Sequence, residues 1–194
     1  EKMREAASRG LGDTRTAVDM VTTLLLSANV KSGAMKFNME PFDFLREAVE
    51  PVFNDLKRDA ELKGLTMVLE PQVAQVCRVL GDKDMLAKHV VRNLVDNAVR
   101  YTPQGEVSIR LECANDKAIL KVKDSGVGIS DEDKTRLFTE GGRGKDSVKV
   151  NVNSTGYGLF FAKQLVETHK GSIRAESEGE GRGSTLIVEL PLAA

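Results

Sequence analysis

Residues 93–103 read NLVDNAVRYTP, and the interpretation of the whole chain starts from this stretch. Asn93 and Asn97 are four residues apart, so on a helix both amides face the same side. Their neutral carbonyl oxygens suit a hard cation such as Mg²⁺ that already carries phosphate oxygens and water. Arg100 and Tyr101 follow one turn later and offer a charge for a phosphate and a flat surface for a base. Taken alone, the pair also fits a helix with solvated asparagines.

A second motif, DSGVG at residues 124–128, follows an apolar run that predicts a strand. An ionised carboxylate at Asp124 only accepts hydrogen bonds, so it suits the exocyclic amine of adenine and disfavours the carbonyl of guanine. Gly126 and Gly128 lack Cβ atoms where the backbone would approach a base. The alternative is an ordinary Asp-Gly turn.

A third motif, STGYGL at residues 154–159, opens a predicted helix. Glycines there leave amide N–H groups exposed at the positive end of a helix, which is a natural phosphate site. The upstream GGRGK is not a Walker A loop, because Lys145 is followed by Asp146 and the first glycine of that motif would fall at Thr139. A dinucleotide-binding interpretation fails as well, since no βαβ unit carries the glycines.

The hydrophobic pattern predicts three helices and a set of short strands after residue 36. We expect helices at residues 44–62, 82–101 and 157–169, and strands at residues 36–44, 65–69, 107–113, 118–123, 173–177 and 185–190. This order predicts an α+β fold, a two-layer sandwich with a mixed sheet and helices on one face. Residues 139–156 are rich in glycine, serine and lysine and are predicted to form a mobile functional loop.

The N-terminal segment has apolar or small residues at alternating steps of three and four. They are Leu11, Thr14, Val18, Val21, Leu25 and Ala28, and Gly33 follows as a plausible cap. This seam is typical of a helix in a coiled coil or four-helix bundle, which needs partners to bury it. The alternative is an amphipathic helix lying on its own domain. The chain begins inside this pattern without Met, which favours a piece of a longer protein.

Composition narrows the class of protein. The chain has 194 residues, a formal net charge of -1 and 41% hydrophobic residues, so we expect no nucleic-acid partner. The longest apolar stretch, residues 20–30, is too short to cross a bilayer, and no signal peptide opens the chain. Cys77 and Cys113 form no CxxC pair, which favours free thiols in a reducing, cytoplasmic location.

Together, these motifs resemble the N, G1, F and G2 boxes of the histidine kinase ATP-binding domain, within the GHKL superfamily and its Bergerat-type fold. The matching segments are residues 93–103, DSGVG, Leu137-Phe138 and STGYGL, and Gly183 to Pro191 resembles the closing strand. Residues 24–44 resemble the second dimerisation helix and linker of the same kinases. The implied organisation is residues 1–33 as an incomplete dimerisation domain and residues 36–194 as the catalytic domain.

The resemblance also implies ligands and roles. ATP and Mg²⁺ are the implied cofactors, with Asn97 as the metal ligand supported by Asn93, and Asp124 reading the adenine amine beside Gly126 and Gly128. Further nucleotide contacts are implied at Arg100, Tyr101, Arg143, Thr155, Gly156, Tyr157, Gly158, Leu159 and Thr185, with Gly156 and Gly158 as hinges of an ATP lid. Two positions depart from the family pattern: Ser154 replaces a glycine and Tyr157 a leucine.

The histidines do not fit the acceptor pattern of such kinases, a His followed by an acidic residue. His169 precedes Lys-Gly at a helix end, and His89 lies one turn before Asn93. His89 is a candidate base near the γ-phosphate; the alternative is a partly exposed helix residue. The resemblance therefore implies that the acceptor lies on another helix, that the parent is a homodimer which passes the phosphate to a response-regulator receiver domain, and that any membrane attachment comes from upstream segments.

Three rival functions remain open from the sequence. An ATPase of the gyrase, chaperone or mismatch-repair type shares the Asp124 motif but places a glutamate base in the N box, where His89 occupies the corresponding turn. A serine kinase of the anti-sigma class lacks the N-terminal helix. A non-enzymatic binding module would have a degenerate pocket, which the set Asn97, Asp124, Gly126 and Gly128 argues against.

Overall fold

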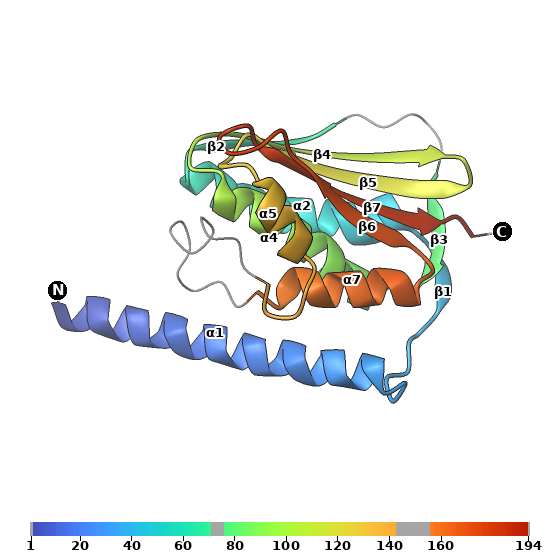
Figure 1. The fold of residues 1–194 in the computed structure, drawn as a ribbon, viewed down its shortest axis with the longest axis horizontal. Coiled ribbons are helices and arrows are strands. Elements are labelled where there is room, and N and C mark those ends of the chain that lie inside the picture. The colour runs from blue at the N-terminus through green and yellow to red at the C-terminus, as the bar shows by residue number, and fades with distance from the viewer. Residues whose placement is uncertain (1, 71–75, 143–155, 194) are drawn as a thin grey trace.

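A five-stranded mixed sheet forms one layer of the molecule in the computed structural model, which describes residues 2–70, 76–142 and 156–193 (Figure 1). The strand order is β2-β4-β5-β7-β6; β2 pairs with β4 in parallel and the other pairs are antiparallel. The strands are β2 Leu65–Leu69, β4 Gly105–Ala114, β5 Lys117–Asp124, β6 Ser172–Glu176 and β7 Ser184–Pro191.

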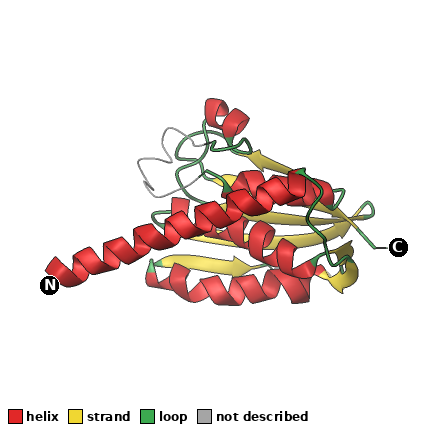
Figure 2. Cartoon of the chain, turned by 90° about the horizontal axis from the view of Figure 1, so that it is seen from below, coloured by secondary structure: helices red, strands yellow, loops and turns green. Residues whose placement is uncertain are grey.

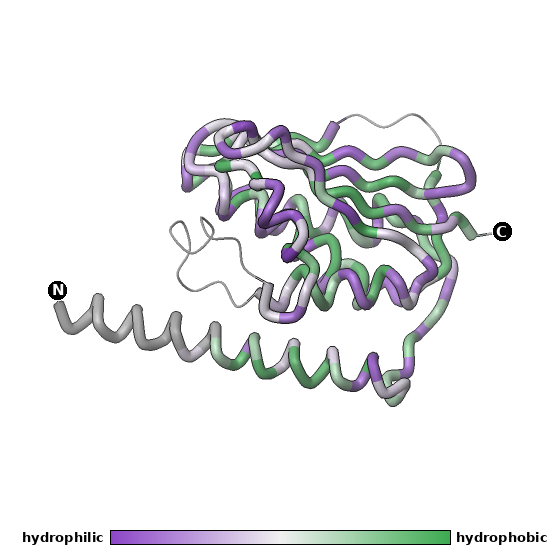
Figure 3. The backbone as a smooth tube through the Cα atoms, in the orientation of Figure 1, coloured by the Kyte–Doolittle hydropathy of each residue, from purple (hydrophilic) through white to green (hydrophobic). Residues whose placement is uncertain are grey.

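Three helices form the second layer and cover one face of this sheet (Figures 1 and 2). They are α2 Glu50–Leu62, α4 Arg92–Tyr101 and α7 Gly158–Thr168. Alternate residues of β4 and β5, such as Val107, Ile109 and Leu120, point into the core because successive strand residues face opposite sides. Helix α4 meets them with Leu94 and Val95, both fully buried. Green and purple alternate along these strands in Figure 3, and the predicted α+β sandwich is confirmed.

Several short elements were not predicted. Strand β3, Arg78–Gly81, pairs antiparallel with β1, Glu40–Asp43, in a separate two-stranded sheet. Helix α5, Asp131–Arg136, follows the DSGVG motif. The predicted helix at residues 44–62 begins with a π-helical stretch, η1 Leu45–Val49, before α2. The predicted helix at residues 82–101 consists of α3 Lys83–Met85, the π-helical η2 Leu86–Val91 and α4. The sequence of β3, RVLG, does not alternate apolar and polar residues, and that of α5, DEDKTR, contains no apolar residue, so hydrophobic spacing gave no signal for either.

Helix α1, Lys2–Lys31, lies along α7 through a face other than the predicted seam (Figures 1 and 2). Ser27 is buried and donates a hydrogen bond of 2.6 Å to Gln164 Oε1. The seam residues Val18, Val21 and Leu25 are 58%, 56% and 62% exposed. The helix therefore contacts its own domain and still presents an unpaired apolar stripe. Among the described residues, no helix is both long and apolar enough to span a membrane.

The two cysteines correct one expectation. Cys77 and Cys113 are joined as a disulfide, with Cα atoms 5.7 Å apart, so the prediction of free thiols is wrong. The two cysteines are 36 residues apart, and no sequence motif links them. Their proximity arises because the segment leading into β3 lies beside the end of β4, which only the tertiary structure brings about.

Candidate functional site

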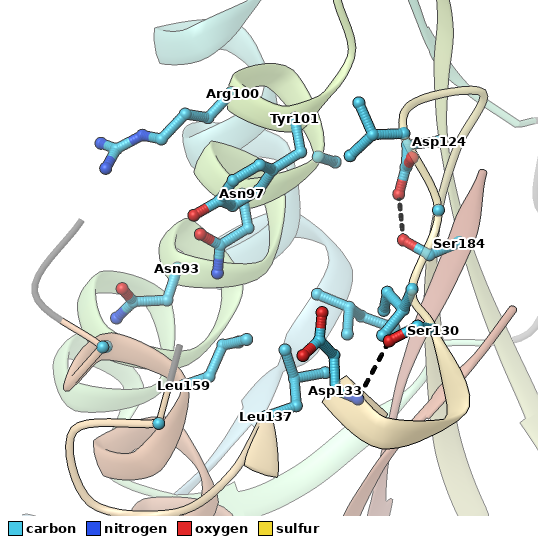
Figure 4. Close-up of a pocket in the computed structure, with 18 of the residues that line it drawn as sticks. Asn93, Asn97, Arg100, Tyr101, Asp124, Ser130, Asp133, Leu137, Leu159 and Ser184 are labelled. Carbon is cyan, nitrogen blue, oxygen red and sulfur yellow. Dashed lines mark hydrogen bonds between the residues drawn. The ribbon is translucent and has the colours of Figure 1, made fainter. Parts of the chain in front are cut away.

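A cavity opens between α4, the loop after β5, helix α5 and the start of α7 (Figure 4). The empty space inside it, counted together with the open solvent at its mouth, is ≈ 1120 Å³. Many predicted site residues line it: Asn93, Asn97, Arg100, Tyr101, Asp124, Gly128, Gly156, Gly158 and Leu159. Residues far apart in the sequence therefore meet in one place, as the motifs required.

Asp124 forms one end of the cavity at the end of β5 and is only 7% exposed. Its Oδ2 accepts a 2.5 Å hydrogen bond from the Ser184 hydroxyl, and its Oδ1 accepts a 2.8 Å bond from the Gly126 N–H. Burial raises the pKa of this carboxyl, and the hydrogen bonds from Ser184 and Gly126 oppose that rise. The protein's own donors thus hold the carboxylate in one orientation before any ligand arrives.

The glycines of DSGVG are required by close backbone contacts. A Cβ on Gly126 would lie 2.3 Å from the Tyr101 carbonyl oxygen. Gly128 has a φ of +72°, and a Cβ there would lie 2.0 Å from the Gly179 carbonyl oxygen. The loop therefore presses directly on the end of α4, and the Val127 N–H donates to Tyr101 O at 3.1 Å. This packing places Asp124 and Tyr101 around the same cavity.

Asn93 and Asn97 form the other end, on the exposed side of α4. The Asn93 Nδ2 donates to the His89 carbonyl at 2.7 Å, which leaves Oδ1 as the outward-facing acceptor. That oxygen faces Gly158, where an added Cβ would lie 2.4 Å from it. The glycine therefore allows α7 to begin close to the Asn93 side chain, which brings the third motif against the first.

This end fits a cation that brings its own ligands. Within the described part of the chain, no group of three His, Cys, Asp or Glu residues could hold a metal. Neutral amide oxygens at Asn93 and Asn97 suit Mg²⁺ that arrives with phosphate oxygens and water, because such an ion needs only one or two protein ligands.

A family model described as "Histidine kinase-, DNA gyrase B-, and HSP90-like ATPase" matches residues 81–194, more than half of the chain. The chain belongs to this ATPase family. The match includes α4, the DSGVG loop and the start of α7, which are the elements that build the cavity.

Relatives and solved structures agree with this assignment. The chain is 33% identical over 192 residues to the sensor protein kinase PmrB of Pseudomonas aeruginosa, covering 96% of this chain and 39% of PmrB. It is 31% identical over 175 residues to the circadian input-output histidine kinase CikA of Synechococcus elongatus, covering 90% of this chain and 23% of CikA. It therefore spans well under half of these relatives.

Among solved structures, the catalytic domain of histidine kinase ThkA is similar with a TM-score of 0.69 and 25% identity, covering 80% of this chain and 97% of that one. Full-length ShkA in complex with AMPPNP superposes with a TM-score of 0.80 at 22% identity, covering 100% of this chain and 39% of ShkA, which shows the shared fold.

Not every predicted residue of this ATPase-family domain faces the cavity. Thr185 lies in a shallow neighbouring depression with Lys123 and Glu176, while Ser184 lines the cavity. Adjacent strand residues face opposite sides of the sheet, so β7 turns the serine inward and the threonine outward. Gly126 and Tyr157 stand next to lining residues and are not part of the wall. Residues that the sequence did not single out also line the cavity: Ala98, Val127, Ile129, Ser130, Asp133, Glu180, Ser184 and Leu186.

His89 does not line the cavity either. Its ring packs edge-to-face against Phe161, with centroids 5.2 Å apart. Burial, assisted by the Lys88 charge, lowers its pKa to about 4, so it is neutral and weakly basic at pH 7. His169 is buried; its Nε2 accepts from the Asp82 N–H at 3.0 Å and its Nδ1 donates to Leu165 O at 2.7 Å. Both rings serve packing of the helices.

Part of the predicted lid lies outside the described residues. Arg143, Thr155 and the remainder of residues 143–155 belong to this segment, so the structure places neither predicted contact. At its downstream edge, Gly156 has a φ of +72°, and an added Cβ would lie 2.9 Å from the Gly141 carbonyl carbon. The two ends of the segment therefore meet at the cavity.

Proposed function

We propose that this chain is the ATP-binding catalytic part of a two-component sensor histidine kinase. In this proposal it transfers the γ-phosphoryl group of Mg·ATP to a histidine on a dimerisation helix outside these 194 residues, and the phosphate passes on to a response regulator. One observation carries the proposal: a buried, oriented carboxylate at Asp124 and the amide pair Asn93 and Asn97 occupy opposite ends of one cavity.

The role proposed for each residue in nucleotide or metal binding follows from its position in the cavity or in the matching motif. Asp124 accepts the adenine amine, and Tyr101 covers the base. Asn97, with Asn93, binds Mg²⁺. Phosphate contacts are proposed for Arg100, Arg143, Thr155, Gly156, Tyr157 and Gly158. Mg²⁺ supplies charge neutralisation at the phosphates, and the residues supply position, which is most of what phosphoryl transfer requires.

Transfer is favoured over hydrolysis by the first turn of α4, where a water-activating carboxylate would be expected. The first turn of α4 has no acidic side chain, so the carboxylate base expected of a gyrase-type ATPase is missing from that turn. The neutral, packed ring of His89, with its pKa lowered to about 4, is a poor substitute. A pocket without a carboxylate at this turn is suited to a phosphoryl acceptor that is presented from outside.

Helix α1 supports the proposed partners. Its exposed stripe of Val18, Val21 and Leu25 can be buried in a helical bundle. We propose residues 1–33 as the second dimerisation helix of a homodimer, residues 36–194 as the catalytic domain, and the receiver domain of a response regulator as the downstream partner.

Nucleotide selectivity tests the first half of the proposal. Calorimetric titration of the chain with ATP and GTP, each with and without Mg²⁺, should show tight, Mg²⁺-enhanced binding of ATP and much weaker binding of GTP. Equal affinities for ATP and GTP would contradict the assignment of Asp124 as the adenine reader.

Phosphorylation tests the second half. The 194-residue chain incubated with γ-labelled ATP should acquire no acid-labile, base-stable phosphate, because neither histidine has an acceptor's context. A longer polypeptide that includes a preceding helix with a His-Glu or His-Asp motif should form a stable dimer and become labelled. Stoichiometric labelling at His89 or His169 would show that the acceptor is already present.

A further inference from the structure

A second carboxylate faces the same cavity, and no role in the proposed function uses it. Asp133 is 9% exposed and lines the cavity together with Asp124. Asp131, two residues earlier in the same short helix, has a side chain that is 97% exposed. Burial of Asp133 is therefore a feature of its position and not of the acidic segment as a whole.

Its placement is defined by the start of α5. Ser130 caps the helix, and its hydroxyl accepts a 3.2 Å hydrogen bond from the Asp133 N–H. This cap orients the first turn so that the Asp133 side chain turns inward beside Leu137. Figure 4 shows the carboxylate pointing into the cavity from the side opposite Asn97.

The position of Asp133 along the cavity limits what it can bind. In Figure 4 it lies between the Asp124–Ser184 end and the end formed by Asn93 and Leu159. With adenine at the first end and phosphates at the second, the group between them is the ribose. Its 2′- and 3′-hydroxyls are adjacent neutral donors, and a carboxylate has two oxygens that only accept. Phosphate oxygens at the same point would be repelled by the charge.

We propose that Asp133 accepts hydrogen bonds from the ribose hydroxyls and makes the pocket selective for ribonucleotides. This inference rests on the proposed function, because it takes ATP as the ligand. Asp133 would be a specificity residue that contacts the sugar, separate from adenine recognition by Asp124 and from metal binding by Asn97.

The experiment compares ATP with 2′,3′-dideoxy-ATP by calorimetry on the whole chain. The parent sequence should bind ATP about tenfold or more tightly than the dideoxy analogue, because hydrogen bonds to a charged group contribute strongly. In Asp133→Ala this ratio should fall close to one. Asp131→Ala, on the exposed side of the same helix, should leave the ratio unchanged.

A second variant and the Mg²⁺ dependence of ATP binding distinguish the remaining explanations. Asp133→Asn retains the shape and one acceptor oxygen, so it should give an intermediate ratio even if the alanine variant folds poorly. An unchanged ratio in both variants overturns the proposal. An unchanged ratio with ATP binding that has lost its Mg²⁺ dependence would instead make Asp133 a metal ligand. Failure of the parent chain to bind any adenine nucleotide would overturn the proposed function itself.

Discussion

The two ends of the cavity are built in different ways. The end proposed for adenine, here called the adenine end, joins segments about 60 residues apart: Asp124 on β5 is held by Ser184 on β7, and its glycine loop presses on α4 and on Gly179. The end proposed for the phosphates, the phosphate end, is largely one helical face, Asn93 and Asn97, with Gly158 placed against it.

The two ends differ in how much of their bonding is in place before a ligand binds. The adenine end has its hydrogen bonds in place before a ligand binds, so little reorganisation is needed and selectivity is built in. In the proposed function, the amide oxygens of the phosphate end would gain their partners only when a cation and phosphates bind. Substitutions at the adenine end should therefore change affinity and folding, and those at the phosphate end should change chemistry.

The largest expected effect is on the rate of phosphoryl transfer. Asn97→Ala should lower phosphoryl transfer by about 100-fold or more, because a metal ligand in the transition state is lost. Its melting temperature should stay close to that of the parent, since the side chain lines an open cavity. Asn54→Ala, at an exposed asparagine on α2, is the control. Transfer is measured in a longer polypeptide that includes the acceptor helix; a large loss of melting temperature with normal transfer per folded molecule would make Asn97 structural.

Asp124→Asn should weaken ATP binding by about 50-fold, because the loss of charge removes a charge-assisted hydrogen bond and the amide can present a donor to the adenine amine. Calorimetry with ATP measures the change, and Asp131→Asn, at a side chain 97% exposed, is the matched control. Undiminished ATP affinity in Asp124→Asn would place adenine recognition elsewhere.

Gly128→Ala should cost about 2 kcal/mol of folding free energy, because it adds a side chain at positive φ and a Cβ 2.0 Å from the Gly179 carbonyl oxygen. Gly181→Ala separates the two causes: its φ of +73° is equivalent, but nothing lies within 4 Å of the added Cβ. That control should cost only about 1 kcal/mol. Equal urea-denaturation midpoints for the two variants would show that the close approach contributes nothing.

The smallest expected effect is a pH dependence at the C-terminal end of α7, where His169 Nε2 accepts from the Asp82 N–H. Burial lowers the pKa of His169 in the folded protein, while the unfolded chain titrates near about 6.5. The contribution of neutral His169 to the free energy of unfolding is therefore fully present above that pH. It is lost as the pH falls below it, by up to about 1.4 kcal/mol per pH unit.

Urea denaturation between pH 7.5 and 5.5 measures this change. His89, whose pKa is lowered to about 4, adds to it with the same sign, so each histidine is replaced in turn. His169→Gln should be less stable at pH 7.5 and should show a shallower decline than the parent. A decline of unchanged slope would mean that His169 does not titrate across folding.

Local spacing was enough to predict much of this molecule. The i, i+4 relation of Asn93 and Asn97 follows from helix geometry alone, and so does the alternation that predicted β4 and β5. The α+β sandwich followed from the order of those elements. These features depend on residues close together in the sequence, where periodicity directly reports which face is buried.

Only the tertiary structure decided the features that join distant segments. The pairing of Asp124 with Ser184 depends on the register between β5 and β7, in which these two residues are partners. A shift of one residue would have turned Thr185 inward, where the family resemblance implies a nucleotide contact for it. The Cys77–Cys113 disulfide and the inward turn of Asp133 have the same origin. Sequence periodicity determines which face of an element is buried, but not which residue of another element lies opposite, because register and packing arise when separate elements meet.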